Sequence, residues 1–429
     1  MLGILIPEFP TQTHIFFWRE IDELRRQGIP VRLISTRRPL ESACRHAFAP
    51  AARAETHYVF PPRWGTVART LLARPRATAR ALGYLVALRE TPWARRVRSL
   101  GLLACAAELL AHARAEGIRH VHAHSCADAA HVVALCRILG GPSYSLTLHG
   151  DLPVYGTDHA AKMAGAACVT CAGPHLKPQI VERVGYPAER VMPNWMGFDV
   201  DRFRSVGRRR DAADALHLVT VARLDACKGH RFALAAMRAA VDAGVDVRYT
   251  LVGDGVDRES IAAEVGRLGL TDRVRFTGTC SEAQVLDVLQ EADAFVLPSV
   301  GLGEAYGVAT AEAMACSLPA ICSDVGSVGV LVRDGIEGFL TRPADVDGLT
   351  QAMLRLGRDP ALRRAMGERA RARIAEMFHV RETVARTVGF IEASAGIRLR
   401  PPAVRPQPRA DDRPATPGGY ARAADAVLT

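Results

Sequence analysis

The sequence predicts an α/β protein with two domains, each built on a doubly wound sheet of parallel strands. Its 429 residues are enough for two separate hydrophobic cores. Short runs rich in β-branched residues alternate with longer helical stretches, which is typical of βαβ units. Several of these runs are apolar almost throughout, as parallel strands covered by helices on both faces are.

Eleven short apolar runs are expected to form the strands. In the first half of the chain they are residues 2–7, 31–36, 120–125, 144–149 and 167–171. In the second half they are residues 216–223, 247–253, 274–277, 294–299, 320–323 and 338–340. Helical crossovers between parallel strands are right-handed, so each half should fold into its own sheet. Two such domains facing each other would bring the carboxyl ends of both sheets to one interdomain cleft, where sheets of this kind bind ligands.

The two halves are separated by a turn-like stretch at 194–199 and a polar, basic stretch at 204–214. We place the hinge near residue 205, so the first domain is expected at 1–205 and the second at 206–375. The last helical stretch, about 368–395, should supply a helix at 376–396 that packs back toward the first domain. Residues 397–429 are rich in Pro, Arg and Ala without periodicity, which predicts a disordered tail.

The composition restricts the partners. The formal net charge is +10, with three lysines among 55 basic residues, and base composition of the encoding genome explains this arginine excess most simply. A basic balance also fits an anionic ligand or an anionic membrane surface. Nucleic-acid binding is not expected, because no base-stacking motif appears. The short apolar start, the scattered cysteines and the lack of an apolar run of about 18 residues predict a cytoplasmic protein without a spanning helix.

Residues 61–100 alternate arginines with aromatic and aliphatic side chains, among them Trp64 and Trp93. This is the pattern of a basic amphipathic surface with interfacial aromatics. One interpretation is peripheral binding to anionic lipid on the inner face of the plasma membrane. The other is a solvated helix pair that covers the first sheet.

Two glutamates, Glu304 and Glu312, lie eight residues apart where the apolar strand at 294–299 gives way to a helix. One carboxylate is expected at the strand-to-helix turn and the other about two turns into the helix. This spacing suits a long ligand with one carboxylate near each end better than a single reacting bond. The helix start between the two glutamates is a ready anion site, because its first amides lack partners.

A second charged pair lies in the loop after the strand at 216–223. Arg223 and Lys228 are placed to converge on one anion, the first as a planar fork and the second as a mobile point charge. The following strand ends in the flexible turn that contains Gly253 and Asp254. With the helix start and the spaced glutamates downstream, this arrangement indicates a phosphate-bearing ligand.

These motifs resemble those of the GT4 family of retaining glycosyltransferases, which have the GT-B architecture. The motifs that carry the resemblance are Ala222-Arg223 with Lys228-Gly229, Val252-Gly253-Asp254-Gly255, Pro298-Ser299, and Glu304-Ala305-Tyr306-Gly307 with Glu312-Ala313. More loosely, Phe9-Pro10, Trp18-Arg19-Glu20-Ile21, His122-Ala123-His124 and His149-Gly150-Asp151 resemble the exopolysaccharide branch of the family. The resemblance covers about residues 1–390. It implies two facing Rossmann-like domains with the donor bound by the second.

The resemblance also implies roles for the candidate residues. Arg223 and Lys228 would neutralise the departing diphosphate, which is transition-state charge stabilisation. Glu312 would accept hydrogen bonds from the ribose hydroxyls, and Glu304 would hold hydroxyls of the donor sugar. Amides of Tyr306, Gly307 and Val308 would lie near the phosphates, Gly253 and Asp254 would flank the donor, and His149 would lie across the cleft.

The first loop departs from the family pattern because 7–13 lacks the glycine pair of many members. Thr11, Gln12 and Thr13 are therefore the candidates for acceptor-side contacts. Asp199-Val200-Asp201 imitates a metal motif but falls in the interdomain link, and Cys168 and Cys171 lie in an apolar run, so neither predicts a metal site. No metal or other cofactor is expected, since Arg223 and Lys228 would supply the positive charge.

The sequence is therefore interpreted as a retaining glycosyltransferase. The expected donor is a UDP- or GDP-linked sugar, and the expected acceptor is a saccharide or a polyprenyl-diphosphate-linked sugar of surface polysaccharide biosynthesis. Alternatives are a nucleotide-sugar epimerase or a phosphorylase of the same fold, or a non-catalytic nucleotide-sugar-binding subunit. A glycoside hydrolase fits poorly, because its two carboxyls must flank one bond about 5 to 9 Å apart.

Overall fold

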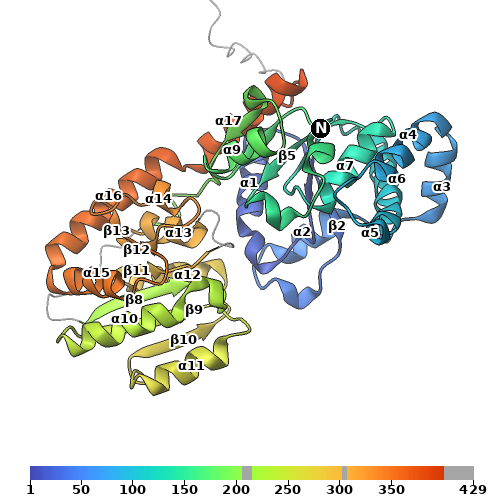
Figure 1. Ribbon diagram of the computed structural model, residues 1–429. Helices are drawn as coiled ribbons and strands as arrows, with labels where there is room; N and C mark the ends of the chain where they lie inside the picture. The colour runs from blue at the N-terminus through green and yellow to red at the C-terminus, as the bar shows by residue number, and fades with distance from the viewer. Residues whose placement is uncertain (205–214, 302–306, 401–429) are drawn as a thin grey trace, which may run out of the picture.

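The computed structural model describes residues 1–204, 215–301 and 307–400 (Figure 1). Two α/β domains face each other, each with one parallel sheet between layers of helices. The hinge predicted near residue 205 and the tail predicted at 397–429 fall wholly or largely outside the described residues.

The first domain contains a seven-stranded parallel sheet in the order β3-β2-β1-β4-β5-β6-β7. Its register is defined by β1, where Leu2 pairs with Val31 on one side and with His120 on the other. The strand order reverses between β1 and β4, which makes this the switch point of the sheet. The strands are β1 (Leu2–Ile6), β2 (Val31–Arg37), β3 (Thr56–Phe60), β4 (His120–Ala123), β5 (Ser143–Leu148), β6 (Val169–Cys171) and β7 (Val191–Pro193).

The helices of the first domain differ in how far they are buried. Helices α6 and α7 carry apolar residues on most of their sides, and both are therefore packed deep in the core. By contrast, α1 buries one side against the sheet and against a helix from the end of the chain. The helices are α1 (Ile15–Arg26), α2 (Ala49–Glu55), α3 (Trp64–Leu72), α4 (Pro75–Val86), α5 (Trp93–Arg98), α6 (Leu100–Ala115), α7 (Asp128–Ile138), α8 (His159–Met163) and α9 (Leu176–Pro178).

The second domain contains a six-stranded parallel sheet in the order β10-β9-β8-β11-β12-β13. Its switch point lies between β8 and β11, where Ala294 pairs with Leu218. All four residues of β11 are buried, as expected for a central parallel strand. The strands are β8 (Leu216–Val221), β9 (Val247–Val252), β10 (Val274–Gly278), β11 (Ala294–Leu297), β12 (Ala320–Ser323) and β13 (Gly338–Thr341).

The helices of the second domain begin with recognisable local signals. Ser281 and Gln284 form a capping box at the start of α12, and Asp345 and Asp359 cap α15 and α16. Among the described residues, no helix is both long and apolar enough to cross a membrane. The helices are α10 (His230–Asp242), α11 (Arg258–Arg267), α12 (Glu282–Glu291), α13 (Val308–Ala315), α14 (Val328–Leu331), α15 (Val346–Arg358), α16 (Pro360–Met377) and α17 (Val380–Ala395).

The end of the chain returns to the first domain. The helical stretch expected at about 368–395 is two helices, α16 and α17, which break at Phe378 and His379. At the break, the amide of Phe198 donates to the carbonyl of Phe378, so the break lies against the crossing point between the domains. Val384 and Val388 of α17 then join the hydrophobic cluster under α1, and Figure 1 shows the red helix beside the blue one.

All eleven predicted strands are present, although most end one or two residues earlier than expected. Two further strands, β3 and β7, were not predicted, because each is short and flanked by polar residues or proline. The stretch 61–100 contains the three helices α3, α4 and α5 and the start of α6 rather than a helix pair.

Candidate functional site

A cavity of about 800 Å³ lies between the two domains, at the carboxyl ends of both sheets. Its walls come from the loops after β1 and β5 of the first domain and after β8, β9 and β11 of the second. Both switch points therefore open onto it, which is where doubly wound sheets bind ligands. A second hollow, of about 670 Å³, lies at the amino-terminal ends of β8, β9 and β10, where this rule predicts no ligand.

Most of the predicted site residues line the interdomain cavity. Thr11 is not among the described residues that line it. Glu304 and Tyr306 lie outside the residues that the structure describes. Those that line it are Gln12, Thr13, His149, Arg223, Lys228, Gly253, Asp254, Gly307, Val308 and Glu312.

The loop after β8 brings Lys228 into the cavity wall. Gly229 follows with φ of 70°, and a Cβ there would lie 1.9 Å from the Pro298 carbonyl oxygen. Glycine is thus required for this loop to lie against the end of β11. Lys228 itself is only 9% exposed, whereas Arg223 is largely exposed, with its Nη1 atom 3.1 Å from Oδ2 of Asp225.

The turn after β9 depends on a glycine in the same way. Gly253 has φ of 137°, and a Cβ would lie 1.9 Å from the Ala222 carbonyl oxygen. The Gly253 amide donates to the Gly278 carbonyl at 2.9 Å, which holds the turn beside the end of β10. Asp254 follows, exposed to solvent at the cavity rim. These two loops form one wall of the cavity, to which Arg223, Lys228 and Asp254 contribute side chains.

Helix α13 begins at the cavity. Gly307 precedes it with φ of 80°, and Val308 is its first residue. The amides of this first turn have no partner inside the helix and carry the positive end of its dipole, so the helix start favours an anion. Glu312 lies about one turn into α13 rather than the two turns expected, because the helix starts after the segment that contains Glu304.

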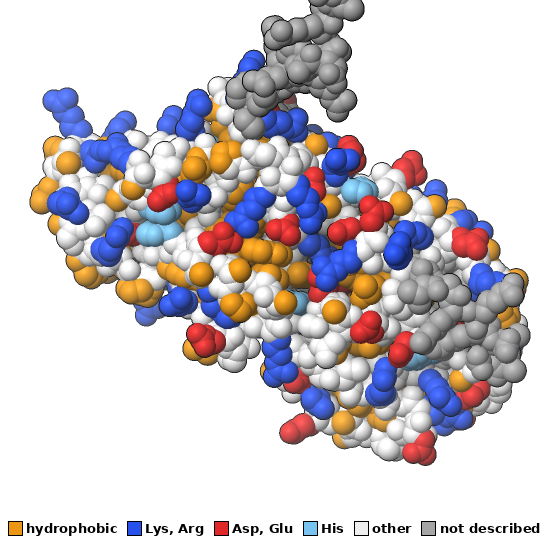
Figure 2. All heavy atoms as spheres, turned by 180° about the vertical axis from the view of Figure 1, so that it is seen from behind, with side chains coloured by type: hydrophobic (Ala, Val, Ile, Leu, Met, Phe, Trp, Pro, Cys, Tyr) orange, Lys and Arg blue, Asp and Glu red, His pale blue; other side chains and the backbone are white. Residues whose placement is uncertain are grey.

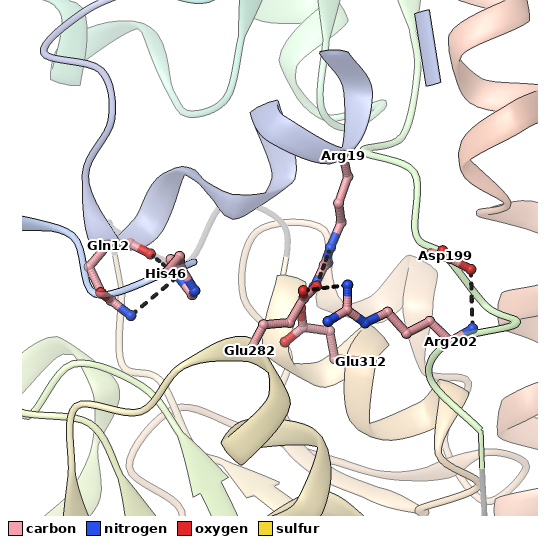
Figure 3. Close-up of polar contacts among 7 residues, drawn as sticks. All are labelled: Gln12, Arg19, His46, Asp199, Arg202, Glu282 and Glu312. Atoms are coloured by element: carbon pink, nitrogen blue, oxygen red, sulfur yellow. Dashed lines mark hydrogen bonds and ion pairs between the residues drawn. The ribbon is translucent and has the colours of Figure 1, made fainter. Parts of the chain in front are cut away.

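Glu312 is held by an arginine from the other domain (Figure 3). The Nη2 atom of Arg19, on α1, lies 2.6 Å from Oε1 of Glu312 and also 2.6 Å from Oε1 of Glu282, on α12. Arg19 is 8% exposed. Arg202, from the segment that joins the domains, lies with Nη1 2.9 Å from Oε2 of Glu282. Two carboxylates and two guanidinium groups therefore form one cluster on the cavity wall.

Burial and charge pairing act in opposite directions within this cluster. Burial raises the pKa of Glu312, and the positive charge of Arg19 opposes that shift. Burial also disfavours the charge of Arg19, but Glu312 and Glu282 outweigh it and raise the pKa of Arg19. The guanidinium carbon lies 4.9 Å from the centre of the Phe203 ring. The cluster is thus a set of desolvated ion pairs, and removal of one partner would leave a buried charge uncompensated.

Gln12 also joins the two domains. Its amide nitrogen donates to the Cys280 carbonyl oxygen at 3.0 Å, and its amide oxygen accepts from the Arg45 amide at 2.9 Å. Nε2 of His46 lies 2.9 Å from the Gln12 carbonyl oxygen, as Figure 3 shows for this side of the cavity. Gln12 therefore helps to hold the two domains together, in addition to any contact with an acceptor.

His149 follows β5 and lies beside the rings of Phe16 and Phe17, whose centres are 5.3 and 5.2 Å from its own. Its Nε2 atom lies 3.2 Å from Nδ1 of His124, and its backbone amide donates to the Tyr155 hydroxyl at 2.7 Å. Its Nδ1 atom is buried without a partner among the described residues. Burial lowers the pKa of His149 to about 3, so its imidazole is neutral at ordinary pH.

Glu20, His122 and His124 bring their potential ligand atoms within 4.8 Å of one another. A carboxylate with two imidazoles suits a transition metal in type. However, Nδ1 of His122 lies 2.7 Å from the Ser145 hydroxyl, and its Nε2 lies 2.7 Å from the Thr147 hydroxyl. Both nitrogens are therefore satisfied by hydroxyl groups, and we assign this group to hydrogen bonding.

Comparison with known proteins gives the family. A family model described as "Glycosyl transferases group 1" matches residues 208–373. The alpha-D-kanosaminyltransferase of Streptomyces kanamyceticus is 30% identical over 275 residues, which cover 58% of this chain and 71% of that protein. The chain belongs to the group 1 glycosyl transferases. An amylovoran biosynthesis glycosyltransferase of Erwinia amylovora is 31% identical over 183 residues, which cover 42% of this chain and 44% of that relative.

Solved structures show the fold of this group 1 glycosyl transferase. The Anabaena protein HepE in complex with UDP superposes with a TM-score of 0.70 at 17% identity, covering 92% of this chain and all of that one. Sucrose-phosphate synthase from Thermosynechococcus elongatus superposes with a TM-score of 0.68 at 20% identity, covering 92% and 98%. The predicted GT-B architecture is therefore confirmed.

Several residues of the transferase's cavity were not predicted as site residues. Arg19, His46 and Glu282 all line it, and none carries a local signal that separates it from a surface charge. The structure buries Arg19 on the side of α1 opposite Phe17 and Ile21, because two residues correspond to about 200° of helical rotation. A buried charge there requires a partner, and neither the burial nor the partner can be read from the pattern.

Proposed function

We propose that the chain is a retaining glycosyltransferase that moves a sugar from a nucleoside-diphosphate donor to an acceptor hydroxyl. One observation carries the proposal: a single interdomain cavity collects Arg223, Lys228, the start of α13 and Glu312. Two cations and a helix start suit a diphosphate, and a carboxylate one turn further suits a ribose diol. The group 1 family supports the activity in general.

The proposed donor is a UDP- or GDP-linked sugar. The structural neighbour HepE was solved with UDP and with UDP-glucose, which supports a nucleotide-sugar in this fold. In the proposed pose the ribose lies at Glu312, the diphosphate lies between Lys228 and the first amides of α13, and the sugar reaches toward His149. Glu304 and the amide of Tyr306 are proposed to hold the sugar and the phosphates, as the family motif implies.

The proposed chemistry replaces one bond to the anomeric carbon on the same face. The acceptor oxygen bonds to that carbon as the bond to the diphosphate oxygen breaks, and the acceptor proton passes to the departing phosphate oxygen. Lys228 and Arg223 stabilise the charge that develops on the diphosphate. These two residues supply the positive charge, so the proposal includes no metal and no other cofactor. His149 lies across the cavity as a hydrogen-bonding group for the sugar.

Donor entry would compete with the contact between Arg19 and Glu312. A carboxylate that receives two ribose hydroxyls must share or give up its 2.6 Å contact with the guanidinium group. Glu282 already accepts from Arg19, so the arginine would keep a partner when the ribose arrives. We therefore propose that nucleotide binding loosens this contact between the domains and adjusts the closure of the cleft.

The proposed domain roles follow the predicted bounds: 1–205 on the acceptor side, 206–375 for the donor, and 376–396 packing toward the first domain. The proposed acceptor is a saccharide or a polyprenyl-diphosphate-linked sugar of surface polysaccharide biosynthesis. A relative named for amylovoran biosynthesis supports this. The acceptor-side candidates are Gln12 and Thr13, which line the cavity, and Thr11 beside them.

The location proposed for the enzyme is the cytoplasmic face of the plasma membrane. Eight large apolar side chains within residues 60–100 are exposed, among them Trp64 at 69% and Trp93 at 70%. The helices α3 to α5 carry six of these eight side chains and also contain six arginines, and Figure 2 shows apolar and basic side chains next to one another at that end of the first domain. Interfacial aromatics with arginines suit anionic lipid.

The test is a thermal-unfolding panel with UDP-, GDP-, ADP- and dTDP-sugars, followed by transfer with the best donor. The right donor should raise the unfolding temperature in proportion to the logarithm of its concentration. NMR of the transferred sugar should show the anomeric configuration of the donor. An inverted product would contradict retention, and an epimerised donor or phosphate-dependent cleavage would favour the alternative activities. Binding without any turnover would favour a non-catalytic subunit.

A further inference from the structure

Three side chains form a line of polar contacts into the interdomain cavity. Glu20 lies on α1, His124 follows β4 and His149 follows β5. Oε1 of Glu20 lies 3.5 Å from Nε2 of His124, and Nδ1 of His124 lies 3.2 Å from Nε2 of His149. At the far end is Nδ1 of His149, a buried atom without a partner among the described residues, on a side chain that lines the cavity.

The hydrogens along this line are linked. A neutral imidazole has one nitrogen that donates and one that accepts, so the state at one end determines the state at the other. If Glu20 is neutral, no negative charge holds the hydrogen of His124 on Nε2; His124 then carries it on Nδ1 and donates to His149, and Nδ1 of His149 carries a hydrogen. If Glu20 is ionised, its charge holds the hydrogen of His124 on Nε2, each step reverses, and Nδ1 of His149 presents a lone pair.

We propose that Glu20 and His124 are positioning residues that set whether His149 donates or accepts a hydrogen bond at the donor cavity. Glu20, on the far side of the line from the cavity, determines this polarity through its protonation. The inference rests on the proposed function only in naming the ligand, an oxygen of the donor sugar or its diphosphate. The polarity of His149 is a property of the chain without any ligand.

The neighbouring ionisable groups leave Glu20 as the one that changes charge near neutral pH. His122 on β4 and His14 before α1 face the same histidines. Burial lowers the pKa of each to about 4, and it lowers that of His124 well below its usual value. All of these imidazoles are therefore neutral above pH 6. Burial raises the pKa of Glu20 to about 8, so it is protonated at pH 7 and ionises in the alkaline range.

At pH 7 His149 therefore offers a hydrogen to an oxygen in the cavity, as suits a phosphate or a sugar hydroxyl. Above about pH 8 it offers a lone pair to the same atom, which repels a phosphate oxygen. Reversal of one hydrogen bond should weaken donor affinity about tenfold. His149 itself gains no charge in this process.

The test is NMR of the whole protein labelled with ¹⁵N-histidine, because the two ring nitrogens give different signals when protonated and unprotonated. The His149 signals, assigned by their loss in His149→Asn, should show hydrogen on Nδ1 at pH 6.5 and on Nε2 at pH 9.5. The signals of His120, which bonds to the Ser143 and Ser145 hydroxyls, should stay constant and serve as the internal control.

Glu20→Gln, checked for an unchanged fold by thermal unfolding, should hold the His149 tautomer constant from pH 6.5 to 9.5 and abolish the alkaline loss of donor affinity. A wild-type His149 tautomer that does not change, or that changes equally in Glu20→Gln, overturns the proposal. Stoichiometric zinc in the purified protein also overturns it, by making the same atoms ligands. The NMR experiment needs no donor. Failure to bind any nucleotide-sugar would therefore refute the proposed function without affecting the result for the His149 tautomer.

Discussion

Arg19 of the first domain and Glu312 of the second are joined by a contact of 2.6 Å between Nη2 and Oε1, on the wall of the proposed donor cavity. The two residues are 293 positions apart in the chain. Both are buried, and Glu282 completes the group. The same carboxylate thus belongs to the contact between the domains and to the surface proposed for the ribose, which links the position of the domains to occupancy of the cavity.

Replacement of Arg19 by methionine should destabilise the protein strongly. It leaves Glu312 and Glu282 without the Arg19 guanidinium, and breaking a buried pair in this way costs about 3–5 kcal/mol. The matched control is Arg25→Met on the same helix, whose pair with Glu55 is partly exposed, with side chains 34% and 38% accessible to solvent. That pair should contribute at most about 1 kcal/mol. Denaturant midpoints measure both effects, and equal shifts for the two variants would refute the assignment.

Replacement of Lys228 by alanine should reduce glycosyl transfer at least ~100-fold, because it removes a contact to the charge that develops on the diphosphate. Glu304→Ala should have a loss of similar size if the family motif assigns its role correctly. Arg238→Ala, which removes a partly exposed arginine paired with Asp242 on α10, is the control and should retain full transfer. Near-normal transfer by both Lys228→Ala and Glu304→Ala would contradict the proposed roles.

Replacement of Gly253 by alanine should weaken donor binding about tenfold or more. Its backbone has φ of 137°, and the new Cβ would meet the Ala222 carbonyl at 1.9 Å, so the turn after β9 must move. Gly266→Ala is a matched control, because it lies within α11 with nothing within 4 Å of the added atom. That variant should be slightly more stable, by up to about 1 kcal/mol. Nucleotide-sugar titration distinguishes them, and unchanged affinity in Gly253→Ala would exclude this turn from the site.

The double variant Trp64→Ser, Trp93→Ser should lose binding to anionic membranes. Both indoles are exposed among arginines on helices α3 and α5, so they are placed to insert at the headgroup level. The measurement is flotation with vesicles of neutral lipid and of neutral lipid mixed with phosphatidylserine. Val256→Ser, which removes an apolar side chain that is 91% exposed on the second domain, should leave binding unchanged. Equal flotation with neutral and anionic vesicles would show that these helices are simply solvated.

The elements that could be predicted from the sequence are those whose signal is local. Apolar runs such as β11 mark buried parallel strands, and the loops after β8 and β9 show their glycines and charges in consecutive residues. The contacts of Arg19 could not be predicted, because its partners come from α12 and α13 and depend on how the two domains meet. The short strands β3 and β7 were missed for a related reason, since edge strands of three to five residues rely on their neighbours for pairing.

The position of Glu312 within its helix was predicted wrongly, because the helix begins only at Val308. Spacing alone placed Glu312 two turns into a helix, whereas Gly307 with its positive φ ends the loop only five residues earlier. The line from Glu20 through His124 to His149 was equally hidden. Glu20 lies within α1, whereas His124 and His149 follow β4 and β5, and the three meet only once α1 packs near the adjacent ends of these strands. Single-sequence patterns identify such residues as polar groups near strands, but not as partners.

Acid should destabilise the protein between pH 6.5 and 4. Burial lowers the pKa of His120 to about 3 and those of His122 and His131 to about 4. Because these folded-state values lie below the unfolded value, the unfolded chain binds more protons as the pH falls, and stability present above pH 6.5 is lost. Each such histidine should contribute a slope of about 1.4 kcal/mol per pH unit in this range.

Glu20 acts in the opposite direction, because its pKa is raised to about 8 and the folded state holds its proton while the unfolded state has lost it. Its contribution to stability is present below pH 4.5 and is lost as the pH rises toward 8. Urea unfolding at several pH values measures the sum. His120→Gln should make the acid slope shallower by one proton, and Glu20→Gln should make it steeper. A slope that neither variant changes would show that other groups govern the acid sensitivity.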